Sequence, residues 1–239
     1  MLYEEIRNQA YLANMQIPKN HLALYTWGNV SAFDKDKGVF AIKPSGVPYE
    51  ELTAESMVIV DVEGKKVDGK LNPSSDTPTH AILYKEFGLK DNAEIGGIIH
   101  THSTYAVSWA QARYDLPLFG TTHADHIQTS VPCTPYLSKE AVEKDYEYET
   151  GLSIIDLFKE RKLNPSEVNM VLCGGHGPFC WGKTADKAVY NATVLEEICK
   201  MALLTLTINP KANTLPEYII NKHYQRKHGP NAYYGQGKN

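Results

Sequence analysis

Apolar residues recur at helical spacing in several segments of the chain. Residues 2–16 are a clear example, because Ile6, Ala10 and Ala13 lie three or four positions apart among charged side chains. Further helices are predicted over residues 75–87, 104–112, 139–162 and 184–206.

The helix predicted from residue 75 has sequence signals at both of its ends. Asp76 and Thr77 place polar side chains before Pro78 in the first turn, and Gly88 is a typical C-terminal stop. In the helix over residues 139–162, a break is expected near Gly151.

Short apolar runs of three to five residues are typical of buried strands. They occupy residues 39–42, 57–60, 95–99 and 170–172, and turn residues follow several of them. Because predicted strands alternate with predicted helices, the sequence indicates an α/β fold of packed layers. No repeat or low-complexity linker interrupts the pattern, so residues 1–239 are expected to form a single domain.

Two histidines mark the end of one predicted strand. His100 and His102 follow the apolar run that ends at Ile99. Alternate residues of a strand point to the same face, so the two imidazoles are expected to lie side by side. Neutral imidazole is the commonest nitrogen ligand for divalent transition metals, which makes this pair a candidate metal site.

His176 is a third candidate ligand, because it also follows a predicted strand, in a glycine-rich loop. Three histidines with an open coordination position are typical of a catalytic zinc-type site. Two other interpretations remain: His176 is an ordinary turn residue, or Cys173 joins it in a structural site. Asp76 fits an oxygen ligand or a base, and it also fits a plain helix N-cap.

Small polar loop segments predict a phosphate site. Ser74-Ser75 precedes a predicted helix, where free N–H groups and the helix dipole attract anions. Gly28-Asn29 and Ser45-Gly46 are similar segments, and Lys43 adds a positive charge. Together they indicate a small phosphorylated substrate.

Two polar regions lie outside this set. Asp125, in the cluster of residues 121–126, is a candidate proton carrier, although it also fits a solvated loop carboxylate. Residues 221–239 are polar, basic and aromatic and show no core face. They fit a frayed tail, or a tail that reaches into the site of a neighbouring subunit.

Composition narrows the class of protein. The hydrophobic content of 42% and charged content of 22% are those of a globular protein, and a net charge of −4 gives no basic surplus for nucleic acid. No apolar stretch is long enough to span a membrane, and no signal peptide is evident. The four cysteines form no CxxC pair, so we expect free thiols and a cytoplasmic protein.

Motifs along nearly the whole chain resemble those of the L-ribulose-5-phosphate 4-epimerases, a branch of the class II sugar-phosphate aldolase superfamily. The metal-site motifs are shared with the aldolases, whereas Thr122-His123-Ala124-Asp125 and Tyr233-Tyr234-Gly235-Gln236 are more particular to the epimerases. The matching segments are residues 27–31, 43–46, 73–80, 100–103, 120–125, 176–179, 223–224 and 232–236.

The resemblance implies a fold and a set of functional residues. The fold is a layered α/β/α domain with a central sheet flanked by helices. A divalent ion, Zn²⁺ or else Mn²⁺ or Co²⁺, is implied on Asp76, His100, His102 and His176. Substrate contacts are implied for Gly28, Asn29, Lys43, Ser45, Gly46, Ser74, Ser75 and Asp76. Asp125 and Tyr234 are implied as the catalytic acid and base.

The resemblance also implies a homotetramer with sites between subunits. Tyr234 and His223 would enter the site of an adjacent chain, and Thr121 and Glu147 would support it. The implied reaction is 4-epimerisation of L-ribulose 5-phosphate to D-xylulose 5-phosphate, by cleavage of C3–C4, rotation of the aldehyde and recondensation. Alternatives are a fuculose- or rhamnulose-phosphate aldolase, a metal hydrolase, and a non-catalytic metal-binding or adaptor protein.

Overall fold

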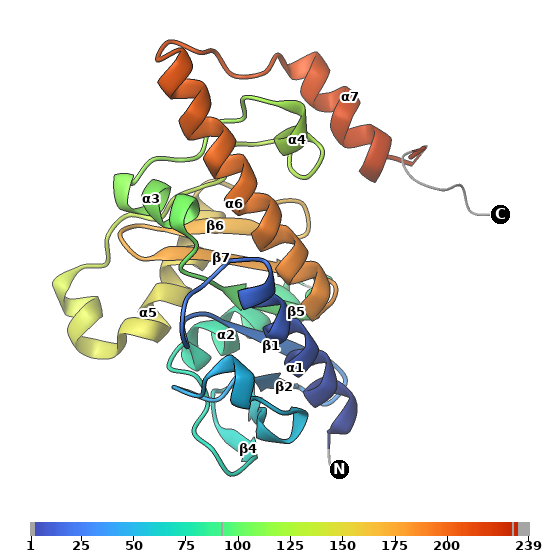
Figure 1. The fold of residues 1–239 in the computed structure, drawn as a ribbon, viewed down its shortest axis with the longest axis vertical. Coiled ribbons are helices and arrows are strands. Elements are labelled where there is room, and N and C mark those ends of the chain that lie inside the picture. The colour runs from blue at the N-terminus through green and yellow to red at the C-terminus, as the bar shows by residue number, and fades with distance from the viewer. Residues whose placement is uncertain (1–2, 92, 231, 234–239) are drawn as a thin grey trace.

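A computed structural model describes residues 3–91, 93–230 and 232–233 of the chain. Over this part of the chain, seven strands form one antiparallel sheet in the order β4-β3-β2-β1-β5-β7-β6 (Figure 1). The strands are β1 (Asn29–Asp34), β2 (Val39–Ile42), β3 (Val58–Asp61), β4 (Lys66–Asp68), β5 (Gly97–His100), β6 (Met170–Cys173) and β7 (Gly177–Gly182).

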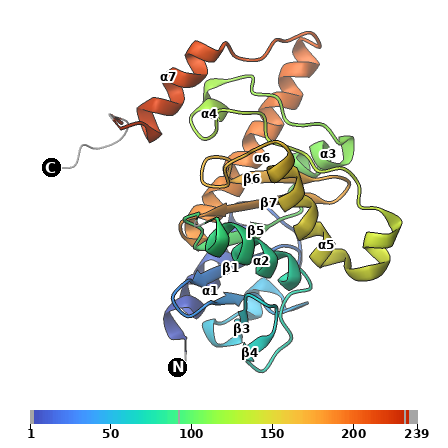
Figure 2. The same ribbon diagram turned by 180° about the vertical axis from the view of Figure 1, so that it is seen from behind.

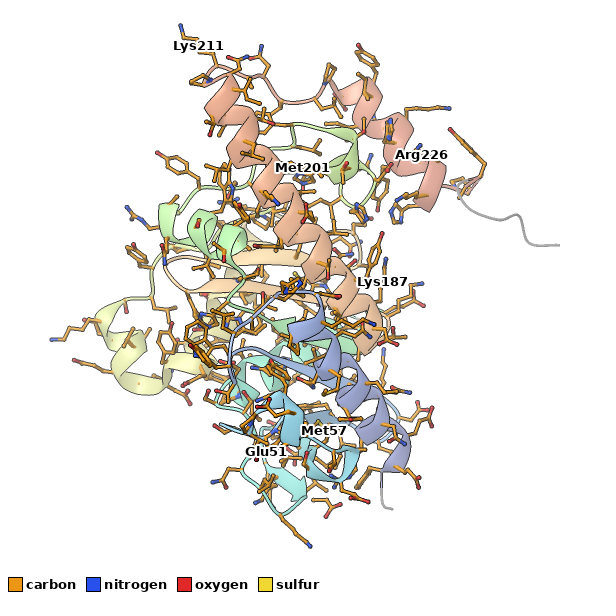
Figure 3. All side chains as sticks on the ribbon, viewed as in Figure 1. Glu51, Met57, Lys187, Met201, Lys211 and Arg226 are labelled. Carbon is orange, nitrogen blue, oxygen red and sulfur yellow. The ribbon has the colours of Figure 1, made fainter. Side chains whose placement is uncertain are left out.

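Helices cover both faces of the sheet, as the α/β/α prediction requires (Figures 1 and 2). One face packs against α1 (Glu4–Lys19), α3 (Thr104–Ala112) and α6 (Ala185–Ile208), and Met57 lies in this layer (Figure 3). The other face packs against α2 (Thr77–Leu83), the π-helical turn η3 (Tyr84–Lys90) and α5 (Lys139–Glu160). The remaining helical elements are η1 (Tyr49–Glu51), η2 (Ala54–Ser56), α4 (Thr121–Ala124) and α7 (Glu217–His228).

Burial on both faces explains why the strands appear as continuous apolar runs. In β5, Ile99 joins the core on the α1 and α6 side, and its neighbour Ile98 joins the core on the α2 and α5 side. Successive side chains of a strand point to opposite faces, so a sheet covered on both faces favours apolar residues at successive positions. All four residues of β5 are buried, including His100 at its end.

Two predicted helix boundaries were wrong, and both depended on a glycine. Gly88 does not end its helix, because the chain continues through it as η3, and a Cβ on Gly88 would lie 3.7 Å from the Phe33 ring. The long helix α5 bends at Asp145, which has non-helical φ and ψ of −166° and 92°, and not at Gly151. Gly151 permits close packing instead, since a Cβ there would lie 2.3 Å from Ile82 of α2.

The segment from residue 221 begins inside a helix. In α7 no residue is buried, and the helix lies beside α4, away from the sheet (Figures 1 and 2). Because α7 buries no residue in the core, polar contacts hold it in place. The composition of this segment therefore did not predict that α7 packs against α4. In the part of the chain described above, no helix combines the length and apolar character needed to cross a membrane.

Candidate functional site

Three histidines converge where β5 ends and β7 begins. His100 is the last residue of β5, His102 follows it, and His176 precedes β7, the strand paired with β5. The Nε2 atoms of His100 and His102 are 3.0 Å apart, and one ligand nitrogen from each of the three residues lies within 4.8 Å of the others. The sheet register therefore brings together the three imidazoles that the sequence predicted as ligands.

The chemistry of these nitrogens fits a cation. Nδ1 of His100 donates a hydrogen bond to the Pro178 carbonyl oxygen at 2.9 Å, which leaves the Nε2 lone pair facing the cluster. Nδ1 of His176 is buried and has no hydrogen-bond partner within the described residues. Burial lowers the pKa of His176 to about 4 and also lowers the pKa of His102, so both stay neutral, as metal ligands must be.

Asp76 lines the same pocket and is oriented by Asn29. Nδ2 of Asn29 donates to Asp76 Oδ2 at 2.6 Å and to Ser74 Oγ at 3.1 Å. Asp76 stands at the N-cap position of α2, but its side chain makes no capping hydrogen bond. Burial opposes its ionisation, yet the neighbouring His100, together with His80 and Asn29, holds the pKa of Asp76 below its usual value. An ionised carboxylate therefore faces the histidines.

A pocket of about 400 Å³ joins the histidines to the predicted phosphate-binding segments. Of the predicted substrate-binding residues, it is lined by Gly28, Asn29, Lys43, Ser45, Gly46, Ser74, Ser75, Asp76 and Glu147. Glu147 reaches the pocket from α5, while the other residues belong to loops or strand ends near β1, β2 and α2. The pocket thus contains a candidate metal site and a candidate anion site in one chamber.

Lys43 is the cation of this chamber. It follows β2 and is almost fully buried, with Nζ donating to the Thr26 carbonyl oxygen at 3.3 Å and lying 5.1 Å from the Tyr49 ring centre. Burial lowers the pKa of Lys43 to about 8. A partly desolvated ammonium interacts strongly with an anion that enters the pocket.

Glycines allow the loops to approach the histidine strand closely. Gly28 has a φ of +77°, and a Cβ there would lie 3.0 Å from the His100 carbonyl oxygen. A Cβ on Gly177 would lie 2.8 Å from the Thr101 carbonyl oxygen. Glycine beside His176 therefore lets the backbone pass close to the strand that carries His100.

Two aromatic residues of the pocket, and one buried histidine next to it, were not identified as site residues from the sequence. Trp27 and Tyr146 line the chamber, and the Tyr146 ring centre lies 5.8 Å from that of His176. His80 lies behind Asp76, fully buried, with Nδ1 2.7 Å from Ser31 Oγ and with burial lowering its pKa to about 3. Its spacing of four from Asp76 was an available signal, because such residues share a helix face.

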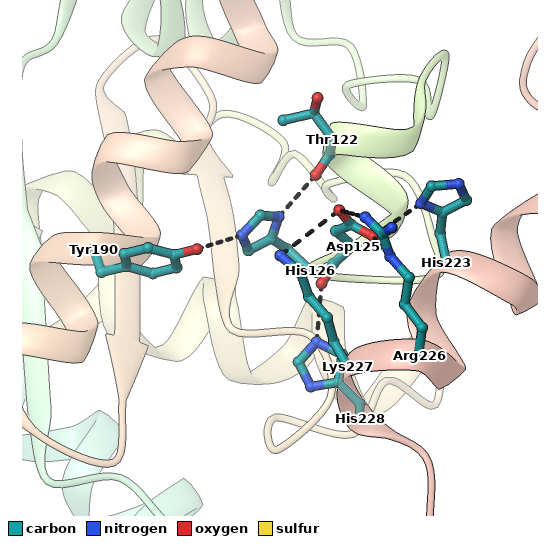
Figure 4. A network of polar contacts seen from close by, with 8 residues as sticks. All are labelled: Thr122, Asp125, His126, Tyr190, His223, Arg226, Lys227 and His228. Carbon is teal, nitrogen blue, oxygen red and sulfur yellow. Dashed lines mark hydrogen bonds and ion pairs between the residues drawn. The ribbon is translucent and has the colours of Figure 1, made fainter. Parts of the chain in front are cut away.

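Three predicted site residues lie elsewhere in the same chain. Thr121 begins α4, Asp125 follows the last residue of α4, and His223 belongs to α7. None of the three lines the chamber. Asp125 instead forms hydrogen bonds with His223 and Arg226 (Figure 4). Tyr234 lies outside the described residues. All four cysteines are buried free thiols, as predicted.

Comparison with known proteins adds to this geometry. The family described as Class II Aldolase and Adducin N-terminal domain matches residues 8–203. The L-ribulose-5-phosphate 4-epimerase UlaF of Salmonella paratyphi B is 47% identical over 233 residues, which cover 98% of this chain and 99% of that protein. The protein of the same name from Salmonella choleraesuis is 48% identical over the same shares of both chains.

Solved structures resemble the fold at lower sequence identity. An L-fuculose 1-phosphate aldolase superposes with a TM-score of 0.76 at 23% identity, covering 93% of this chain and 95% of its own. A sugar-phosphate aldolase of Thermotoga maritima gives a TM-score of 0.65 at 17% identity, covering 90% of this chain and 99% of its own. These likenesses concern the architecture alone.

Proposed function

The chain belongs to the family of the Class II Aldolase and Adducin N-terminal domain, and on that premise we propose that it is a divalent-metal-dependent L-ribulose-5-phosphate 4-epimerase. It would interconvert L-ribulose 5-phosphate and D-xylulose 5-phosphate. The observation that carries the proposal is the convergence of three imidazoles on a pocket that also holds Lys43 and Ser74-Ser75. The identity of nearly half of the sequence to proteins named as this epimerase supports the substrate.

The reaction requires cleavage of a carbon–carbon bond. The C4 proton of ribulose 5-phosphate is not α to the C2 ketone, so simple deprotonation gives no stabilised carbanion. Cleavage of C3–C4 yields the enediolate of dihydroxyacetone together with glycolaldehyde phosphate. The aldehyde group of glycolaldehyde phosphate then rotates and presents its other face before the C3–C4 bond forms again. A divalent cation bound by His100, His102 and His176, with Asp76 as a further ligand, would supply Lewis acidity worth several kcal/mol.

The residues of the chain hold the substrate and move its protons. Lys43 and the N–H groups at Ser74-Ser75 would bind the phosphate, which keeps the aldehyde fragment in the pocket while its carbonyl rotates. One proton carrier is needed on each side of the C4 oxygen, and we assign these roles to Asp125 and Tyr234. The metal in the cell is proposed to be zinc, with manganese or cobalt as substitutes.

A homotetramer with its sites between subunits would complete the chamber. Asp125 and His223 are hydrogen-bonded to each other and lie outside the pocket of their own chain. We therefore propose that Asp125, Thr121, His223 and the tail up to residue 239 enter the pocket of a neighbouring subunit together. Glu147 lines the pocket of its own chain and would support the substrate there. The four buried free thiols support a reducing compartment such as the cytoplasm.

A product assay tests this proposal. Purified protein supplied with Zn²⁺ or Mn²⁺ should convert L-ribulose 5-phosphate to D-xylulose 5-phosphate until both pentuloses reach equilibrium, and a chelator should stop the reaction. Free dihydroxyacetone should stay far below the amount of pentulose converted. Stoichiometric release of a ketone and an aldehyde would instead identify an aldolase, and the absence of any turnover would indicate a non-catalytic protein.

The pKa of Lys43 predicts how activity depends on pH. Lys43 is cationic below a pH of about 8 and neutral above it. If its charge binds the phosphate, kcat/KM should fall above that pH by up to about tenfold per unit, because only the cationic form attracts the anion. The Lys43→Arg variant stays charged throughout this range, so its alkaline decline should be absent or displaced to higher pH. An identical alkaline decline in both proteins would refute the role of Lys43.

A further inference from the structure

One carboxylate, that of Asp125, is held by a single face of α7 (Figure 4). Nε of Arg226 donates to Oδ1 at 3.0 Å and Nη2 donates to Oδ2 at 2.6 Å. Nδ1 of His223 also donates to Oδ1 at 3.0 Å, and Lys227 Nζ lies 3.6 Å from Oδ2. Nε2 of His228 donates to the backbone oxygen of Asp125 at 3.0 Å. Both carboxylate oxygens are therefore occupied.

The spacing of these residues explains their convergence. Positions 223, 226 and 227 are separated by three and four residues, so their side chains project from one side of a helix. Since α7 buries none of its residues, these polar contacts contribute much of what fixes α7 against α4. The contact between Asp125 and Arg226 is bidentate, the geometry that a planar guanidinium favours and an ammonium cannot reproduce.

Other titratable groups lie near Asp125 and Arg226, but they do not make the bidentate contact that Arg226 makes. His126, next to Asp125, has Nδ1 2.7 Å from the Thr122 carbonyl oxygen and Nε2 2.9 Å from the Tyr190 hydroxyl of α6. Lys187 of α6 also acts electrostatically on His126. Burial raises the pKa of Asp125, but the hydrogen bonds from Arg226 and His223 and the charge of Lys227 bring it below its usual value.

We propose that Arg226 is a positioning residue for epimerisation, which fixes the direction of the Asp125 carboxylate and keeps that carboxylate ionised. The inference rests on the proposed function and on the role of Asp125 as a proton carrier. Arg226 acts through Asp125 and does not itself contact the substrate. In the resting enzyme Asp125 is then the base of the pair of proton carriers, because a carboxylate that accepts from an arginine holds no proton to give.

Two substitutions separate orientation from charge. Arg226→Met removes both, so kcat should fall on the order of 10²-fold, the cost of a misplaced catalytic group, while KM stays within about threefold of its original value. The acid limb of the pH profile, where kcat/KM falls as the pH is lowered, should also move to higher pH. The reason is that the pKa of Asp125 rises without the guanidinium. Arg226→Lys keeps the charge and loses the bidentate contact, so it should lower kcat and leave the acid limb in place.

Two control experiments test whether Arg226 acts on the reaction only through Asp125. Lys211→Met removes an exposed cation that lies between α6 and α7, outside the tail of residues 221–239, and it should leave kcat and the pH profile unchanged. In an Asp125→Asn background, Arg226→Met should cause no further loss of kcat greater than about twofold, because residues that act as a unit are not additive. Circular dichroism and size-exclusion chromatography should show that each variant is folded and assembled.

The outcomes distinguish this inference from the proposed function. If the unsubstituted enzyme does not interconvert the pentulose phosphates, the proposed function itself fails. If that enzyme is active and Arg226→Met keeps its kcat and its acid limb, the inference alone is overturned. A further large loss in the Asp125→Asn background also overturns it. Should Arg226→Met not fold, Arg226→Lys decides: a lowered kcat with an unmoved acid limb supports the role, and an unchanged kcat refutes it.

Discussion

Replacing His102 by asparagine should remove the bound divalent metal and lower kcat by at least about 10³-fold, because Lewis acidity worth several kcal/mol is lost and each 1.4 kcal/mol is a factor of ten. His102 is the most exposed of the three histidines, so this substitution disturbs the core least. His100→Asn should give the same result, although it also removes a ring stacked 4.5 Å from that of Phe179.

A matched control excludes a general effect of losing a histidine. His21 is exposed, follows α1 and has a φ of +56°, a conformation that asparagine adopts readily. His21→Asn should retain both the metal and full activity. Metal analysis of the purified proteins and the epimerase assay provide both measurements. A His102→Asn protein that keeps one ion per chain would show that the ligand set is wrong.

Replacing Asp125 by asparagine should lower kcat on the order of 10²- to 10⁴-fold and leave the metal content unchanged, as expected when an essential acid or base is lost. The two residues have nearly the same shape, and the amide oxygen of asparagine can still accept a hydrogen bond from Arg226. The loss should therefore reflect proton transfer more than the position of α7. Tyr234→Phe is expected to cause a loss of similar size.

Metal content separates this prediction from the preceding one. The Asp125→Asn protein should bind metal as the unsubstituted protein does, whereas the His102→Asn protein should not. A second comparison uses Asp115, a surface carboxylate that is paired with Arg161 at 2.5 Å and does not line the chamber. Asp115→Asn should keep full activity. Near-normal epimerisation by both Asp125→Asn and Tyr234→Phe would show that the proton carriers are assigned wrongly.

The histidine cluster was the most predictable part of the candidate site, because local sequence determined the relation between two of its three members. His100 and His102 follow an apolar strand, so their relation to each other depends only on strand geometry. The position of His176 beside these two histidines also depends on how β5 and β7 pair, in the register that sets His100 opposite Phe179. No local pattern encodes that register, and the role of His176 as a third ligand was therefore one of several interpretations of the sequence.

Strands covered on both faces were harder to identify than the helices. β1 mixes Ser31 and Asp34 with apolar residues, and β7 contains Gly177 and Pro178, so neither is the continuous apolar run expected of a strand covered on both faces. Both lie between helices, and tertiary packing determined their conformation. The break predicted at Gly151 was wrong for a related reason, since this glycine permits close contact with α2 within a continuous helical turn.

The polar cluster around Asp125 could not be derived from composition. Its members come from residues 125 and 223–228, about a hundred positions apart, and charged side chains in a polar segment usually face solvent. One of the two interpretations of residues 221–239, a frayed tail, followed from the same reasoning. The structure shows that α7 is placed by ion pairs, which carry no hydrophobic periodicity.

The most direct test of the account is a titration of metal-free protein with Zn²⁺ in which bound metal and conversion of L-ribulose 5-phosphate are measured in the same samples. We expect both quantities to rise together and to reach a plateau at one ion per chain, with no response in His102→Asn. Full epimerisation by the metal-free protein, or saturation with metal without any conversion, would contradict the central claim.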